Sequence, residues 1–209
     1  MKGLLWKDLY VAAKYCRAYL LLVGAFLVFS AFSGENLFVI FYPCILASMV
    51  PMNLLAYDAQ FKWEQYAGTL PYTREQLVSA KYLIGLFTAG AVLVLTGIAQ
   101  AVRLSLGGGF RLGEFGNLMA VMFILSLIAP SISLPLMYRF GVEKGRILYL
   151  VTIGVFCGGS ALASILLSPG FFAQEFSFTL GLPLVCLAAA AVYAFSWRLA
   201  VRFYRKRDL

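Results

Sequence analysis

The sequence predicts an all-α integral membrane protein with six transmembrane helices and both termini in the cytoplasm. Three observations predict this fold class. Of the 209 residues, 62% are hydrophobic and only 12% are charged, whereas soluble domains carry about 25% charged residues. The charges are clustered, which leaves six long charge-free stretches. Finally, Lys and Arg are concentrated in alternate segments between those stretches, as in proteins with a fixed membrane orientation.

Each charge-free stretch approaches the roughly 20 apolar residues that a spanning helix needs. The first stretch is short for a crossing, and the fifth is long. The predicted spans are 18–34, 36–57, 82–102, 115–138, 147–174 and 176–197.

The orientation follows from the basic residues. With the N-terminus inside, the inner segments hold fifteen Lys and Arg residues, and the outer segments hold only Arg103 and Arg111. Because cytoplasmic segments carry the excess of basic residues, both termini and the loop 58–81 are expected in the cytoplasm. The net charge of +8 is then a topology signal. Nucleic-acid binding is not expected, since the basic residues flank spans and form no separate domain.

Residues 1–17 precede the first span and predict an amphipathic helix lying in the membrane interface. Lys7 and Lys14 would face anionic headgroups on its polar side. The apolar face would consist of Leu5, Leu9, Ala12 and Cys16. The alternative is a positively charged topology anchor with no further role.

The segment 58–81 is the long polar interruption of the chain, and it predicts two short helices. A first helix over 58–69 would place Ala59, Trp63 and Tyr66 on one face, and it would end at Leu70, before a proline. A second helix would begin with a capping box formed by Thr73 and Gln76. We expect a loop with this much order to contact a partner.

Little chemistry is available to this chain alone. It has no histidine, and none of its four cysteines forms a C-x-x-C pair, so neither a metal site nor a cofactor is expected. It contains no G-x-x-x-x-G-K-[ST] phosphate-binding loop. No charge falls at mid-depth in a predicted span, which disfavours ion-coupled transport. We therefore expect no enzymatic activity, and an energy source in a separate ATPase subunit.

Three stretches resemble a known family. They are Met1–Leu9, the loop sequence from Trp63 to Tyr82, and Pro135–Gly141 with Lys144. Together with length and topology, they resemble small six-span permeases of type 2 ABC transporters, similar to those of bacterial phenol-soluble-modulin peptide exporters. The resemblance implies one permease domain over 1–209 in the bacterial plasma membrane. It also implies a second permease copy, identical or related, and ATP-binding subunits that carry ATP and Mg²⁺.

The resemblance further implies a coupling helix between the second and third spans, within 58–69, that docks on the ATPase. The docking candidates are Phe61, Lys62, Trp63, Glu64, Gln65, Tyr66 and Arg74, with Arg139, Glu143 and Lys144 in the second cytoplasmic loop. The alternative for the aromatic residues is a position in the membrane interface.

By the same resemblance, the first, second and fifth spans of the two permease copies would line a path. This path would open alternately to the inside and to the outside of the membrane. The candidate lining residues are Phe26, Phe29, Phe38, Phe41, Met49 and Met52; lipid contact or core packing is the alternative for each. An uncharged path suits amphipathic or hydrophobic peptides. Two other functions stay open at this point: an immunity or sensor protein that binds a toxin or lipid without transport, and a lipid-modifying membrane enzyme.

Overall fold

The computed structural model describes residues 2–15, 17–32, 37–67, 69–106, 112–152, 154 and 178–205. Every regular element in these ranges is a helix. The helices are α1 (Lys2–Tyr15), α2 (Arg17–Phe32), α3 (Leu37–Ser48), α4 (Val50–Gln60), α5 (Trp63–Ala67), α6 (Arg74–Leu106), α7 (Leu112–Phe140) and α9 (Phe178–Arg205). A further helical segment covers 142–152.

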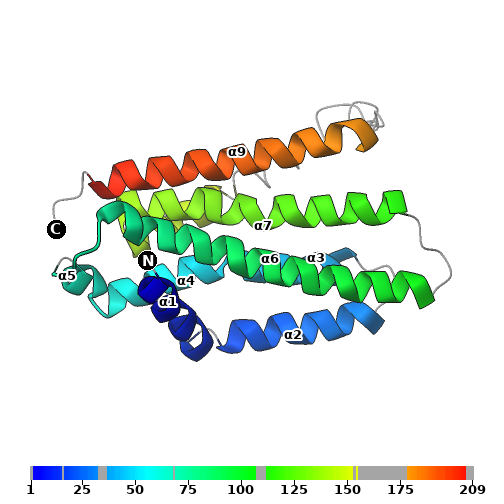
Figure 1. Cartoon of the computed structure of the whole chain (residues 1–209), viewed down its shortest axis with the longest axis horizontal. Coiled ribbons are helices and arrows are strands. Elements are labelled where there is room, and N and C mark those ends of the chain that lie inside the picture. The colour runs from blue at the N-terminus through cyan, green and yellow to red at the C-terminus, as the bar shows by residue number, and fades with distance from the viewer. Residues whose placement is uncertain are drawn as a thin grey trace.

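The long helices run along the long axis of the molecule (Figure 1). The helices α6, α7 and α9 pack against one another, and α2, α3 and α4 lie against α6. The short helix α5 lies where α4 ends, α6 begins and α9 ends, and α1 crosses the bundle near it (Figure 1). We call this the basal end of the bundle.

Four helical stretches are long and apolar enough to cross a bilayer: Ile40–Gln60, Arg74–Arg103, Phe115–Phe140 and Pro183–Arg205. They correspond to the second, third, fourth and sixth predicted spans. The first predicted span coincides with α2, whose 16 residues reach only about 24 Å at about 1.5 Å per residue. The fifth predicted span lies outside the described residues after position 154. The total of six spans therefore stays a prediction.

The second span is interrupted once. Met49 separates α3 from α4, and Pro51 lies in the first turn of α4. A proline has no backbone N–H to donate, so it is tolerated in a first turn and disrupts a helix interior. The interruption is small, since Met49 N still donates to Leu46 O at 3.1 Å.

Polar contacts join three long helices within the bundle. The Tyr82 and Ser196 hydroxyls lie 2.8 Å apart, and Ser196 Oγ donates to Ser131 O at 2.6 Å. Tyr193 Oη donates to Tyr82 O at 2.7 Å. These bonds satisfy hydroxyls that would otherwise be buried without partners, and they fix α6, α7 and α9 to one another.

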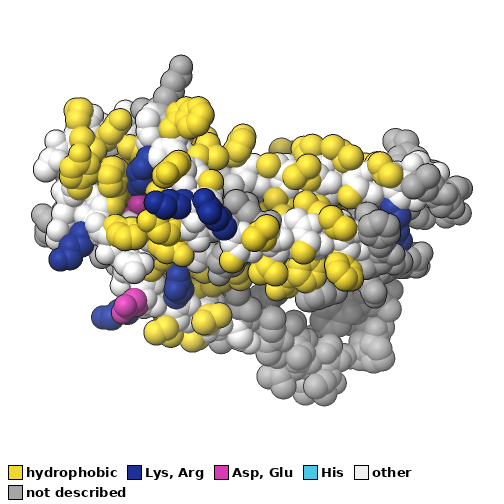
Figure 2. Space-filling model, turned by 90° about the horizontal axis from the view of Figure 1, so that it is seen from below, with side chains coloured by type: hydrophobic (Ala, Val, Ile, Leu, Met, Phe, Trp, Pro, Cys, Tyr) yellow, Lys and Arg dark blue, Asp and Glu magenta, His cyan; other side chains and the backbone are white. Residues whose placement is uncertain are grey.

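The surface has the distribution expected of a membrane protein. In Figure 2, hydrophobic side chains cover much of the described middle of this face, and basic side chains gather mainly toward the basal end. Large apolar residues exposed on the long helices include Phe87, Ile98 and Phe195. A surface this apolar along the middle of the helices is one that lipid tails can solvate.

The structure corrects the predicted orientation of α1. Its buried face consists of Leu4, Asp8 and Ala12, while Leu9 is exposed. Lys7 lies toward the protein, on the side that carries Asp8. Ala12 is buried as predicted and Leu5 is partly buried. The prediction is wrong for Leu9 and Lys7, because ion pairs inside the protein neutralise Lys7 and Asp8, which need not point to water.

Candidate functional site

The connection from α4 to α6 contains the helix α5, and the predicted single helix over 58–69 is wrong. The chain stays helical through Gln60, where α4 ends, and then turns at Phe61 and Lys62. Lys62 adopts a φ of 52°, a left-handed conformation that places most non-glycine residues under strain. This turn interrupts the helix, so α5 is a separate five-residue helix.

The start of α6 confirms the predicted capping box. Gln76 N donates to Thr73 Oγ1 at 3.3 Å, and Thr73 N donates to Gln76 Oε1 at 3.2 Å. These two bonds satisfy backbone N–H groups that have no partner within a helix. They fix where α6 begins relative to α5.

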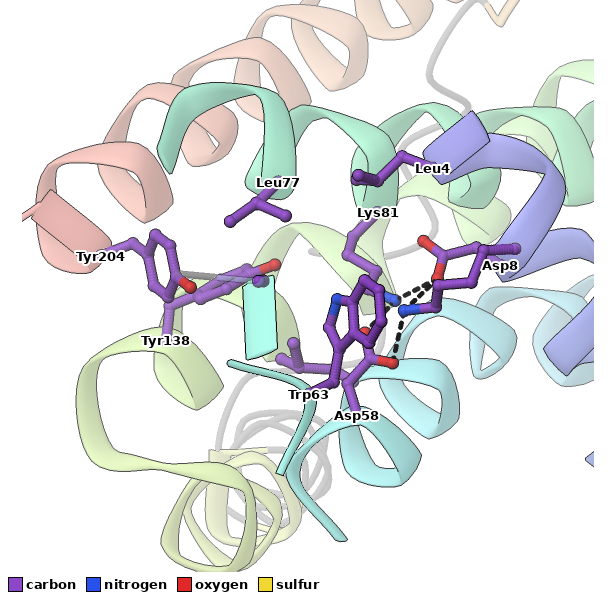
Figure 3. A pocket seen from close by; sticks show the side chains of 11 residues that line it. Leu4, Asp8, Asp58, Trp63, Leu77, Lys81, Tyr138 and Tyr204 are labelled. Carbon is purple, nitrogen blue, oxygen red and sulfur yellow. Dashed lines mark hydrogen bonds and ion pairs between the residues drawn. The ribbon is translucent and has the colours of Figure 1, made fainter. Parts of the chain in front are cut away.

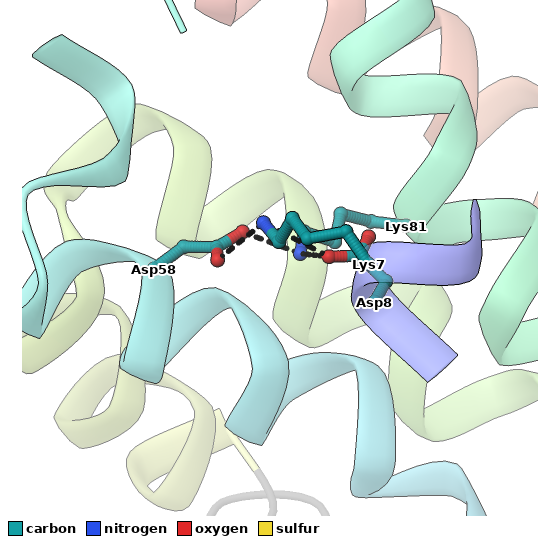
Figure 4. A network of polar contacts seen from close by, with 4 residues as sticks. All are labelled: Lys7, Asp8, Asp58 and Lys81. Carbon is teal, nitrogen blue, oxygen red and sulfur yellow. Dashed lines mark hydrogen bonds and ion pairs between the residues drawn. The ribbon is translucent and has the colours of Figure 1, made fainter. Parts of the chain in front are cut away.

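Four charged side chains meet just inside the basal end (Figure 4). Lys7 and Asp8 come from α1, Asp58 from the last turn of α4, and Lys81 from α6. Lys81 Nζ lies 2.7 Å from Asp8 Oδ1 and also contacts Asp58. Lys7 Nζ lies 2.8 Å from Asp58 Oδ1 and 3.1 Å from Asp8 Oδ1. We call these residues the charge quartet.

The quartet is buried and electrically balanced. Asp8 is 0% exposed, Lys81 4% and Asp58 6%. Isolated charges at such depth would be strongly destabilising, and pairing offsets that desolvation. Asp8 Oδ2 makes no hydrogen bond in the described structure, so the pairing leaves one acceptor unsatisfied. The quartet therefore holds α1, α4 and α6 in one relative arrangement.

Trp63 of α5 covers the quartet from the outside (Figure 3). Lys7 Nζ lies 3.9 Å from the centre of the Trp63 ring, a cation–π contact. Beneath it is a cavity of about 20 Å³, room for about one water molecule. Its lining comprises Leu4, Lys7, Asp8, Leu55, Asp58, Trp63, Ala67, Leu77, Lys81, Tyr138 and Tyr204. The position of α5 is thus tied directly to the charges that join three other helices.

The predicted docking residues divide between the two sides of α5. Phe61 is 59% exposed and Tyr66 58%, and Lys62 and Gln65 are also exposed. Trp63 is half-buried against Lys7. The backbone of Glu64 lies in α5, and its side chain lies outside what the structure describes.

Arg74 lies apart from α5, at the end of α9. Its Nη1 donates to Tyr204 O at 3.3 Å and to Arg205 O at 3.1 Å. A guanidinium at the carboxyl end of a helix satisfies free carbonyl groups and complements the helix dipole. This contact gives Arg74 a structural role within the bundle.

The second predicted cytoplasmic loop also lies at the basal end. The Arg139 guanidinium is about 5 Å from the rings of Phe140 (5.0 Å) and Phe203 (5.2 Å). Glu143 and Lys144 are exposed at the start of the helical segment 142–152. These residues therefore share the basal end with α5.

The candidate path residues are only partly brought together: Phe26 and Phe41 pack against one apolar cluster, and Met52 belongs to another. Phe26 is half-buried, with its ring 4.3 Å from that of Tyr42, and Phe29 is exposed. Phe41 and Met49 are half-buried, and Met52 belongs to the apolar core at the basal end. Phe38 lies in α3 with its side chain outside the described part. None of them lines the cavity beneath Trp63.

Sequence reasoning missed the quartet. From the sequence, Lys7 is expected to face headgroups, Lys81 belongs to the cytoplasmic excess of basic residues, and Asp58 begins the polar loop. A signal was present in the four-residue spacing of Leu4, Asp8 and Ala12, which places an acid on an otherwise apolar face. No spacing within α1 identifies Asp58 and Lys81 as its partners.

The described residues contain no group of three or more Cys, Asp or Glu side chains that could hold a metal ion. No curated protein and no solved structure matches the chain. A family profile described as "ABC-2 family transporter protein" matches residues 3–205, which is nearly the whole length and includes every helix of the site. The chain belongs to the ABC-2 family of transporter membrane proteins and is a multi-pass permease component of an ABC transporter.

Proposed function

We propose that this chain forms the permease domain of an ATP-driven exporter that moves amphipathic or hydrophobic peptides out of a bacterial cell. Two permease copies, identical or related, would assemble with ATP-binding subunits on the cytoplasmic side of the plasma membrane. The observation that carries the proposal is the placement of α5, which presents aromatic side chains outward while Trp63 rests on the charge quartet.

The outward side of α5 suits a protein partner. Phe61 and Tyr66 are both more than half exposed, and exposed aromatic residues on a fixed element are typical anchors in protein interfaces. The Phe61 ring also lies 5.7 Å from that of Tyr15 in α1. A subunit that binds here would therefore contact an element already linked to α1.

The quartet supplies a physical route from docking to transport. A displacement of α5 acts on Trp63 and, through its contact with Lys7, on ion pairs shared by α1, α4 and α6. Buried ion pairs resist stretching because separated charges lose their compensation at low dielectric. The three helices would then move together, and the permease halves would alternate between inward and outward openings.

The proposed cargo follows from the apolar character of the spans. Phe26, Phe29, Phe38, Phe41, Met49 and Met52 remain the candidate lining residues of the path. Aromatic and methionine side chains adapt to varied apolar surfaces, as a carrier of amphipathic peptides requires. Inorganic ions would find no compensating charge along such a path.

The docking proposal is tested by co-purification with an ABC-type ATP-binding subunit encoded beside this chain. Phe61→Ala with Tyr66→Ala is expected to abolish co-purification and permease-stimulated ATP hydrolysis. Tyr10→Ala is the matched control, since Tyr10 is an equally exposed aromatic residue (67%) on α1 and should leave both unchanged. Wild-type levels of complex and ATP hydrolysis in the double variant would show that α5 is not the docking element. A wild-type chain that binds peptide without any ATP-binding subunit would favour the immunity or sensor function instead.

A further inference from the structure

A second, larger cavity lies at the basal end, away from the quartet. Its volume is about 700 Å³, within the range of small-molecule and ligand pockets in proteins. It opens between α4 and the helical segment 142–152. Its lining comprises Asn53, Ala56, Tyr57, Ala59, Gln60, Val142, Glu143 and Arg146. The lining therefore combines polar and apolar side chains around one opening.

Asn53, which lines this cavity, carries a hydrogen-bond donor that no described residue accepts from. The residue is 8% exposed, and its Nδ2 is buried with no hydrogen-bond partner in the described structure. Leaving a buried donor unsatisfied destabilises a protein, because the group has lost its hydrogen bond to water. A ligand that offers an acceptor oxygen would remove this penalty.

Arg146 supplies a cation beside that donor. Among the described residues, its guanidinium makes one hydrogen bond, from Nη2 to Asn53 Oδ1 at 3.5 Å, which is long for a bond of this kind. A guanidinium has five N–H donors in a planar fork that matches a carboxylate. Arg146 and Asn53 together thus present several donors to one place.

The remaining lining distinguishes between possible oxyanions. Glu143 adds a negative charge at the same opening, and Tyr57, Ala56 and Val142 add apolar surface. A carboxylate attached to an apolar peptide with its own N–H donors fits all three features. Glu143 repels a lipid phosphate and a carboxylate alike, but a peptide also brings N–H donors from which Glu143 can accept.

We propose that this cavity, which we call the α4 pocket, binds the carboxylate of an amphipathic peptide before transport. Arg146 and the Asn53 amide hold the carboxylate, and Glu143 accepts from a peptide N–H or ammonium group. The inference rests on the proposed function and deepens it, because it assigns a cargo-selecting site distinct from the docking surface on α5.

The test measures peptide binding to the purified full-length chain in phosphatidylcholine nanodiscs. Two probes are compared: one amphipathic helical peptide with a free C-terminal carboxylate, and the same peptide as its C-terminal amide. The wild type is expected to prefer the carboxylate by about tenfold, as one charge-assisted hydrogen bond allows. Arg146→Gln should bind both peptides equally. Arg202→Gln is the matched control, an exposed arginine near the end of α9 that does not line the pocket, and it should keep the preference.

Asn53→Leu provides a second readout that does not depend on Arg146. It removes the unsatisfied donor and keeps a side chain of similar branched shape, so the empty protein should unfold at a higher temperature while its carboxylate preference falls. A variant that keeps the full preference overturns the assignment. So does an Arg146 effect that appears only when phosphatidylglycerol is added to the discs, since lipid phosphate would then be the ligand.

Co-purification with the ATP-binding subunit tests the proposed function independently of peptide binding. Arg146→Gln should still co-purify with the ATP-binding subunit, because α5 is unchanged. Normal complex formation without carboxylate preference in the wild type refutes the α4 pocket alone. Absence of any complex in the wild type refutes the exporter, whatever the peptides do.

Discussion

Lys81 and Asp58 show how a few residues fix the basal end. Both are almost fully buried, and each contacts two partners of opposite charge in the quartet. The apolar surroundings raise the free energy of any charge left alone, so the four side chains stabilise the fold only as a balanced set. Single and paired substitutions should therefore differ sharply.

Replacing Lys81 with Met is expected to destabilise the protein by about 3–5 kcal/mol, since two buried carboxylates would then share the single cation of Lys7. Adding Asp58→Leu should recover much of the lost stability, because Lys7 and Asp8, whose Nζ and Oδ1 lie 3.1 Å apart, can still pair. Thermal unfolding of the purified variants measures both effects.

Glu75→Gln is the control for this comparison. It removes the exposed ion pair with Arg205, whose side chains are 54% and 60% exposed, and surface pairs contribute about 0–1 kcal/mol. Equal unfolding temperatures for Lys81→Met and Glu75→Gln would mean that the quartet does not hold the basal end together.

At the scale of elements, α7 and the segment 142–152 approach each other closely at Gly145. Gly141 has a φ of 85° at the turn between them, a conformation that favours glycine. A Cβ on Gly145 would lie 2.7 Å from Met137 Cα, which is backbone and cannot rotate away. The second cytoplasmic loop therefore brings the wall of the α4 pocket directly against α7.

Gly145→Ala should displace the segment 142–152, lower the unfolding temperature and weaken peptide binding in the α4 pocket, because Val142, Glu143 and Arg146 line it. Gly90→Ala is the matched control, since nothing lies within 4 Å of an added Cβ there and alanine favours the helix. Unchanged unfolding and binding in Gly145→Ala would show that the two helices can separate without consequence.

For the molecule as a whole, the sequence predicts features that depend on composition over about 20 residues or on local spacing. It does not predict contacts between residues that lie far apart in the sequence. Spans matching α6, α7 and α9 follow from charge-free runs, and the α6 cap follows from the spacing of Thr73 and Gln76. The orientation of α1 does not, because it depends on Asp58 and Lys81, far away in sequence. Nor does the α4 pocket, because Asn53 belongs to the second span and Arg146 to the second predicted cytoplasmic loop, far away in sequence.

Membrane orientation is the remaining prediction at this scale. The 33 residues of α6 extend about 50 Å at about 1.5 Å per residue, whereas the hydrocarbon core is about 30 Å thick. Its two ends should therefore project into water on opposite sides. The excess of basic residues at the basal end predicts that this end lies in the cytoplasm.

In a variant without the native cysteines, a membrane-impermeant maleimide should label Ser105→Cys in intact cells. It should label Gln65→Cys only after permeabilisation. Both positions are exposed in the structure, so burial cannot account for a difference between them. Labelling of Gln65→Cys in intact cells would show the opposite orientation. The helix α5 would then lie on the outer side of the membrane, which ATP-binding subunits cannot reach.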